Sequence, residues 1–256
     1  MPGAGATGES GHVKWSMRKS VVLAVAAGAV LAVAGHGVAS AEPADQVPAY
    51  DFHDCPALPA GADPHRWVCE VHVATGDMSF GKVRVDAFAP ITTTHAEGPG
   101  PDGTTAQVFG GVRSGATRIP GGVFGVPGSD RHPLLRLYLR PAYGGYADFI
   151  SQGDRMGVLD LTFPLAGGLL DDGCVAGRPG DAVRFQLIRT APPEQVSTNP
   201  RILKVHAVDD TYAVPAARGC GRLTGFLNHR LGLPAPAGHN HATFTAYAVV
   251  QPYDRL

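Results

Sequence analysis

The sequence has little charge and no excess of either sign. Charged residues make up 17% of its 256 residues, and 21 Lys and Arg stand against 22 Asp and Glu, which gives a net charge of -1. A near-neutral chain lacks the basic surplus that attracts phosphate backbones or anionic lipids. We therefore expect no nucleic acid partner.

The sequence also lacks the short motifs that mark common catalytic and cofactor sites. No Gly-x-Ser-x-Gly elbow occurs, and the nearest string, residues 111–115, misplaces its serine by one position. No two cysteines have CxxC spacing, and the glycine pairs form no GxGxxG set that opens a helix. We therefore expect no cofactor and favour a function without catalysis.

The apolar run near the start of the chain is too short to cross a membrane. It covers residues 21–34, or 14 residues, whereas a spanning helix needs about 20. Arg18 and Lys19 precede the run and Ala39-Ser40-Ala41 follows it, which is the pattern of a secretory signal peptide. We predict a signal peptide over residues 1–41, with Met1 or Met17 as the start. Residues 42–256 would then be a secreted, extracellular domain with no stable membrane anchor.

Only four cysteines occur, and all lie within the predicted secreted part: Cys55, Cys69, Cys174 and Cys220. An even count in an exported chain indicates disulfides. Of the three possible pairings we favour Cys55–Cys69 with Cys174–Cys220, because each partner is the nearest in sequence. Oxidising export argues against a zinc site built from these thiols.

Alternating apolar and polar residues are the main positive signal. This period of two is typical of half-buried antiparallel strands. It occurs in seven segments, residues 67–73, 82–87, 135–140, 159–165, 183–187, 203–207 and 243–250, and more weakly in residues 107–112 and 118–124. We therefore predict an all-β fold, an antiparallel β-sandwich or a closed barrel, with the sandwich favoured.

Two segments depart from the strand pattern. Leu223, Phe226, Leu227 and Leu231 recur at helical spacing, which predicts one short helix over residues 221–231 near the C-terminus. Residues 191–200 are rich in Pro, Ser, Thr and Asn and could link two domains. A Cys174–Cys220 bridge would enclose this stretch, so we predict a long connection within a single domain.

Several stretches resemble a group of secreted proteins from Streptomyces-like actinobacteria. They are residues 55–64 (CPALPAGADP) with Trp67 and Cys69, residues 146–149, 155–157 and 213–221, and the ending at residues 253–256. The resemblance covers most of residues 42–256. It implies an actinobacterial source and an extracellular location, and it carries no activity, since the group has none assigned.

The most suggestive binding residues are the aromatic residues around Gly144-Gly145, namely Tyr138, Tyr143, Tyr146 and Phe149. Aromatic rings presented by loops can stack on sugars or fill a partner's pocket, although they can equally seal a core. We therefore expect an extracellular glycan, the cell wall or a protein as the partner.

Histidines offer weaker candidates. His239 and His241 are two residues apart, as a pair of metal ligands on an extended segment would be, but no third ligand can be identified, so we predict no metal. His53 lies between Asp51 and Asp54, the residue types of a carboxylate-oriented imidazole.

The sequence thus favours a secreted, non-enzymatic binding domain. The alternative is an extracellular hydrolase whose residues are scattered along the chain, since catalytic triads assemble from distant positions. A pocket that brings a histidine within hydrogen-bonding reach of a serine or a carboxylate would favour the hydrolase.

Overall fold

The computed structural model of the chain describes residues 46–256. The predicted signal peptide, residues 1–41, lies outside these residues. The described part consists mostly of antiparallel strands with one α-helix near its end. The strands are β1 (Val68–Phe80), β2 (Val83–Val85), β3 (Ile91–Pro99), β4 (Thr105–Ser114), β5 (Thr117–Arg118), β6 (Tyr138–Leu139), β7 (Ala142–Asp148), β8 (Arg155–Ala166), β9 (Val175–Ala176), β10 (Val183–Arg189), β11 (Glu194–Thr198), β12 (Arg201–Asp209), β13 (Ala217–Arg218) and β14 (Ala242–Pro252). The helix is α1 (Thr224–Leu231), and five 3₁₀ turns cover Pro64–Arg66, Ser129–Arg131, Pro133–Leu135, Gly221–Leu223 and Tyr253–Arg255.

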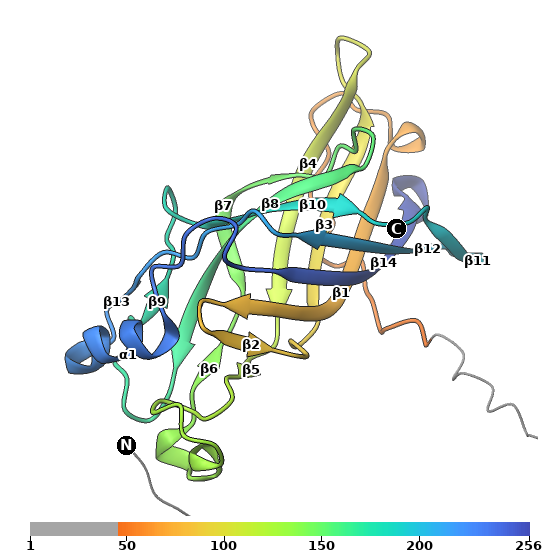
Figure 1. Ribbon diagram of the computed structural model, residues 1–256. Helices are drawn as coiled ribbons and strands as arrows, with labels where there is room; N and C mark the ends of the chain where they lie inside the picture. The colour runs from red at the N-terminus through yellow and green to blue at the C-terminus, as the bar shows by residue number, and fades with distance from the viewer. Residues whose placement is uncertain (1–45) are drawn as a thin grey trace, which may run out of the picture. The chain divides into compact units, whose positions relative to one another are not determined.

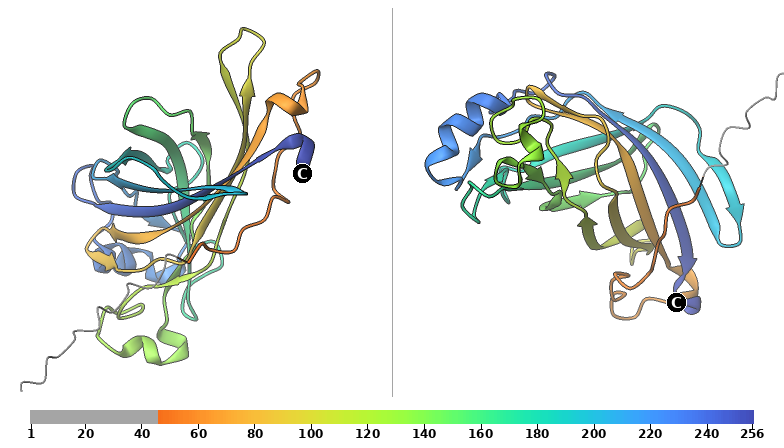
Figure 2. Two further views of the ribbon diagram at one scale, coloured as in Figure 1. Left: turned by 90° about the vertical axis from the view of Figure 1, so that its right-hand side faces the viewer. Right: turned by 90° about the horizontal axis from the view of Figure 1, so that it is seen from below.

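Nine of the strands follow one another in a single sheet in the order β13-β9-β8-β10-β12-β14-β1-β3-β4 (Figure 1). The others pair beside this path: β2 with β1, β11 with β12, β6 and β7 with β8, and β5 with β6. The paired strands run antiparallel, as in the long ladders of β1 with β14 and of β12 with β14. The sheet curls into a half-barrel, and the view from below in Figure 2 shows the long strands following an arc. The predicted all-β antiparallel class is confirmed. The architecture is a single curled sheet that is more strongly curved than one layer of a sandwich but does not close into a barrel.

Strand β4 lies at one end of the sheet, and β7 pairs with β8 toward the other end. Contacts between β4 and the end of β7 connect these two sides of the half-barrel. The backbone N–H of Phe149 donates to Oε1 of Gln107 over 2.6 Å, and the Phe109 ring stacks on Tyr143 with centroids 4.5 Å apart. The curl therefore brings β3, β4 and the end of β7 around one concave space.

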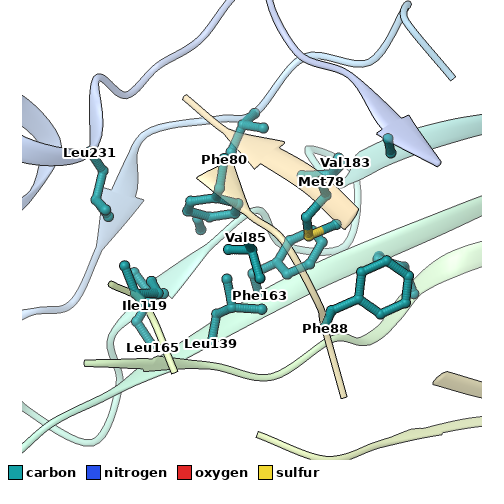
Figure 3. Packing of buried hydrophobic residues seen from close by; sticks show 14 of the residues in the cluster. Met78, Phe80, Val85, Phe88, Ile119, Leu139, Phe163, Leu165, Val183 and Leu231 are labelled. Carbon is teal, nitrogen blue, oxygen red and sulfur yellow. The ribbon is translucent and has the colours of Figure 1, made fainter. Parts of the chain in front are cut away.

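A packed apolar core fills one part of the concave side. Figure 3 shows side chains from β1, β2 and β8, including Phe80, Val85 and Phe163, in mutual contact. The rings of Phe80 and Phe163 meet edge to face, with centroids 5.3 Å apart. This part of the half-barrel has the dense packing of a normal protein interior.

The convex side is covered by the segment that precedes β1. Val47, Tyr50 and Phe52 pack against a second cluster made of Ile202, Tyr247 and Val249 from β12 and β14. Parts of β12 and β14 are therefore covered on both faces.

Both disulfides have the pairing favoured from the sequence. Cys55 is bonded to Cys69 and Cys174 to Cys220, and the described residues contain no free cysteine. The first bridge ties the covering segment to β1. The second joins the chain before β9 to the start of the turn that leads into α1, within the core.

The helical segment also matches its prediction. A 3₁₀ turn at Gly221–Leu223 leads directly into α1, and the helix ends at Gly232, whose φ of 69° is the left-handed conformation that favours glycine. Leu227 and Leu231 are buried, whereas Phe226 is exposed and meets Phe124 edge to face. Among residues 46–256, no helix is both long and apolar enough to cross a membrane.

Replacing Tyr212 with phenylalanine is expected to lower the free energy of unfolding by about 1–3 kcal/mol. The single proton of the buried Tyr212 hydroxyl is shared between the carbonyl oxygens of Ser79 and His241, at 2.7 and 2.9 Å, and phenylalanine would remove this buried hydrogen bond. Urea unfolding at pH 7 measures the loss.

The same variant tests an alkaline effect. Burial and then the charge of Asp209 raise the pKa of Tyr212, so above pH 10 the unfolded chain loses this proton before the folded chain does. The wild-type protein should lose stability as the pH rises above 10, and Tyr212→Phe should lose less. Equal alkaline losses in the two proteins would show that this hydroxyl does not cause them.

Candidate functional site

A cavity of about 320 Å³ lies on the concave side of the sheet, beside the packed core. Most of its lining is apolar and comes from alternate positions of four strands. These residues are Leu159 and Leu161 on β8, Phe185 and Leu187 on β10, Val205 and Ala207 on β12, and Phe244 and Ala246 on β14. Their period of two is the pattern that predicts a buried face. Thr105 and Ser151 are exposed members of the lining and mark its outer end.

One wall of the cavity is polar. Glu70 and His72 on β1 and Glu97 on β3 contribute to the lining. In the ladder between β1 and β3, His95 lies directly opposite Glu70. Side chains opposite each other and two residues apart share one face of a sheet, so the register gathers these groups.

The polar groups are close together. Nε2 of His72 lies 3.2 Å from Oε2 of Glu70, within hydrogen-bonding distance. Nε2 of His95 lies 3.9 Å from Oε2 of Glu70 and 3.9 Å from Oε2 of Glu97, which is too far for a hydrogen bond. The ring of Phe149 covers both imidazoles, with its centroid 5.0 Å from that of His95 and 5.6 Å from that of His72.

The surroundings fix the charge of this cluster. Burial is the largest influence on Glu70 and raises its pKa, but the hydrogen bond from His72 and the nearby positive charges outweigh it and hold the pKa below its ordinary value. Burial lowers the pKa of His95 and outweighs the carboxylates of Glu97 and Glu70, which raise it, and the adjacent His72 lowers it further. At neutral pH the cluster therefore combines an ionised carboxylate with a neutral imidazole.

His95 is unusual because its buried imidazole makes no hydrogen bond within the described residues. Its side chain is 1% exposed, and neither ring nitrogen makes a hydrogen bond to any residue of the described chain. Buried polar groups in native proteins are nearly always hydrogen-bonded, so an orphaned buried imidazole points to a site with a use for it.

No family model, curated protein or solved structure matches this chain. The function therefore has to be argued from the geometry of the site.

The aromatic residues favoured from the sequence do not form one group. Tyr143 and Tyr146 lie on strand β7 rather than in a loop, both exposed, and the guanidinium of Arg184 lies 5.1 Å from the centre of the Tyr146 ring. Tyr138 lies apart on β6. Of the four, Phe149 alone lines the cavity.

The histidine candidates from the sequence are placed elsewhere. His241 pairs with Asp210, and His53 lies among Asp51, Asp54 and Arg113 on the surface. Within residues 46–256, the one group of three metal-ligating residue types gathered closely enough to hold an ion is Glu70, His72 and His95. His239 and His241 are not part of it.

The sequence contained a signal for this site. Glu70-Val71-His72 and His95-Ala96-Glu97 each place two polar side chains on one face of a strand. The alternation in residues 67–73 predicts a half-buried strand with Glu70 and His72 on its polar face, and it predicts no strand at β3. Without β3 the two pairs could not be brought together.

Proposed function

We propose that residues 42–256 form a secreted, non-enzymatic binding protein that holds a small apolar molecule in the cavity of the half-barrel. The observation that carries this proposal is the cavity itself, enclosed by apolar side chains from four strands. Small-molecule sites are typically concave and mostly apolar, with a few polar groups that orient the ligand. Secretion is supported by the leader pattern, by the two disulfides and by the resemblance to secreted actinobacterial proteins.

The volume limits the size of the ligand. A water molecule occupies about 30 Å³, and a methylene group is of similar size, so about ten such groups fill the cavity. A ligand with an unbranched or cyclic apolar body of this size fits, with a polar end toward Glu70, His72 and Glu97.

Filling the cavity should weaken ligand binding strongly. Ala246 lines the cavity from β14, and phenylalanine at this position would place a ring in the space. If the ring displaces about four methylene-sized groups worth about 0.8 kcal/mol each, Ala246→Phe should weaken binding of decanol by about 200-fold. Displacement of fluorescent N-phenylnaphthylamine by decanol measures the affinity.

The matched control concerns the exposed apolar surface. Hydrophobic probes also bind such patches, and Phe124 is a large exposed apolar side chain on this protein, 45% exposed. Phe124→Ser should leave the decanol affinity unchanged. Binding that falls in Phe124→Ser and survives in Ala246→Phe would place the ligand on the surface and contradict the proposal.

A hydrolase is the second candidate, and one observation favours it. The cavity brings His72 within hydrogen-bonding reach of the Glu70 carboxylate, an arrangement that suits a general base. The test is hydrolysis of nitrophenyl butyrate by the wild-type protein, with His72→Gln as the comparison. Turnover that His72→Gln removes would favour the hydrolase over the binding protein, and decanol binding without turnover would favour the reverse.

A further inference from the structure

The group Glu70, His72 and His95 has no role in holding an apolar ligand body. We propose that these three side chains bind one divalent transition-metal ion of the Zn²⁺ type at the polar wall of the cavity. The proposal does not depend on what the apolar part of the cavity binds.

The spacing of the ligand atoms fits a metal ion. Zn²⁺ binds imidazole nitrogen and carboxylate oxygen at about 2.0–2.2 Å, so two ligand atoms of a tetrahedral site lie about 3.4 Å apart. The separations of Oε2 of Glu70 from Nε2 of His72 and of His95, 3.2 and 3.9 Å, lie on either side of this value. The three ligand atoms all lie within 4.8 Å of one another. Small side-chain rotations would bring them to one ion.

His95 supplies the independent observation. It is fully buried, it faces the carboxylate of Glu70, and both of its ring nitrogens lack hydrogen bonds within residues 46–256. An ion bound to Nε2 would give this nitrogen the partner that the surrounding residues do not provide.

The ligand types indicate the class of ion. Two imidazoles with one carboxylate suit Zn²⁺ and the late first-row divalent ions, whereas Ca²⁺ and Mg²⁺ prefer sites built from oxygen. Glu70 and His72 line the cavity, so the ion would keep a coordination position facing it. Glu97, with Oε2 3.9 Å from Nε2 of His95, lies near enough to act as a further ligand or as a partner for bound water.

The experiment uses the full chain, purified without a histidine tag and stripped of metal. Co²⁺ replaces Zn²⁺ in such sites, and its visible absorption reports the coordination. We expect one equivalent of Co²⁺ to give a spectrum at pH 7, displaced by Zn²⁺, and Zn²⁺ to raise the melting temperature. Loss of an outer hydrogen-bonding partner typically weakens a metal site by 10–100-fold, so loss of a direct ligand in Glu70→Gln, His72→Gln or His95→Gln should cost at least about 100-fold.

The matched control is His241→Gln. His241 is also an imidazole beside a carboxylate, that of Asp210, but it lies outside the group. This variant should bind Co²⁺ as tightly as the wild-type chain. If His95→Gln does not fold, as judged by circular dichroism, then Glu70→Gln and His72→Gln decide the question.

Two results would overturn the proposal. One is no Co²⁺ spectrum and no stoichiometric Zn²⁺ binding by the wild-type chain, and the other is binding that persists in the folded Glu70→Gln and His72→Gln variants. Decanol binding is measured separately in the presence of EDTA. Failure of the metal site and failure of the apolar site can therefore be told apart.

Discussion

Replacing Cys174 and Cys220 together with alanine is expected to lower the free energy of unfolding by about 4 kcal/mol. In the chain-entropy model, a bridge stabilises the fold by restricting the unfolded chain, and the gain grows with the length of the closed loop. The two cysteines are 46 residues apart, and the loop between them contains the five strands β9 to β13. Both sulfurs lie in the main core, so alanine also removes buried contacts. Urea unfolding of the two proteins, with matched fitted slopes, measures the difference.

The second bridge of the protein provides the control. Cys55 and Cys69 are 14 residues apart, and the same model gives about 3 kcal/mol for their loop. The double alanine variant of this pair should therefore be the more stable of the two. For a domain of this size, a loss of 4 kcal/mol corresponds to a fall in Tm of about 8–16 °C. A larger loss from the Cys55–Cys69 pair would show that loop length does not set the order.

The strands that were predicted best are those with one strongly apolar face. On β8, β10, β12 and β14 the alternating apolar residues line the cavity or the core, so burial and sequence period agree. A period of two directly reports which residues share a face. The pattern does not require knowledge of any other strand, which is why it can be read from the sequence alone.

Strands without that contrast were missed. On β3, Thr93, Thr94, His95 and Ala96 are all buried, so both faces of the strand are covered and its polar residues do not mark a solvent side. The hydrophobic alternation that identifies a half-buried strand is absent there. This is also the strand that carries half of the candidate site.

Two predicted strands were shortened by local chemistry. In the segment 135–140, Pro133–Leu135 forms a 3₁₀ turn and only Tyr138–Leu139 pairs as a strand. In the segment 118–124, Gly121 and Gly122 have φ values of 71° and 57°, so the chain turns there after the short β5. Proline and left-handed glycine outweighed the apolar spacing in these places.

The sequence of a single strand does not tell which of its two faces lies on the concave side of the sheet. On β1 the alternation places Cys69, Val71 and Val73 on the apolar face and Glu70 and His72 on the polar face of a half-buried strand. The structure places Glu70 and His72 at the cavity, because the curl of the sheet puts that face on the concave side. Period two separates the faces of a strand, but only the assembled sheet determines which of them is enclosed.

Strand β8 allows stability and ligand binding to be separated on one element. Phe163 is fully buried and packs against Phe80 in the solid core, whereas Leu159, four residues earlier on the same strand, lines the cavity. Phe163→Ala would leave a new void, and we expect it to lower the free energy of unfolding by about 4 kcal/mol. Since Phe163 does not line the cavity, the decanol affinity should stay within about twofold of the wild-type value.

Leu159→Ala should cost less stability than Phe163→Ala but should weaken decanol binding more. Its side chain already faces a cavity, so truncation forfeits fewer contacts and should cost about 2 kcal/mol, near the lower end for a leucine truncation. A bound alkyl chain would lose contact with the leucine, worth about 1 kcal/mol, so the decanol affinity should fall about fivefold. Urea unfolding and probe displacement on both variants provide the four values. A fall in decanol affinity in Phe163→Ala as large as that in Leu159→Ala would contradict the prediction that decanol contacts Leu159 in the cavity independently of the packing of Phe163 in the core.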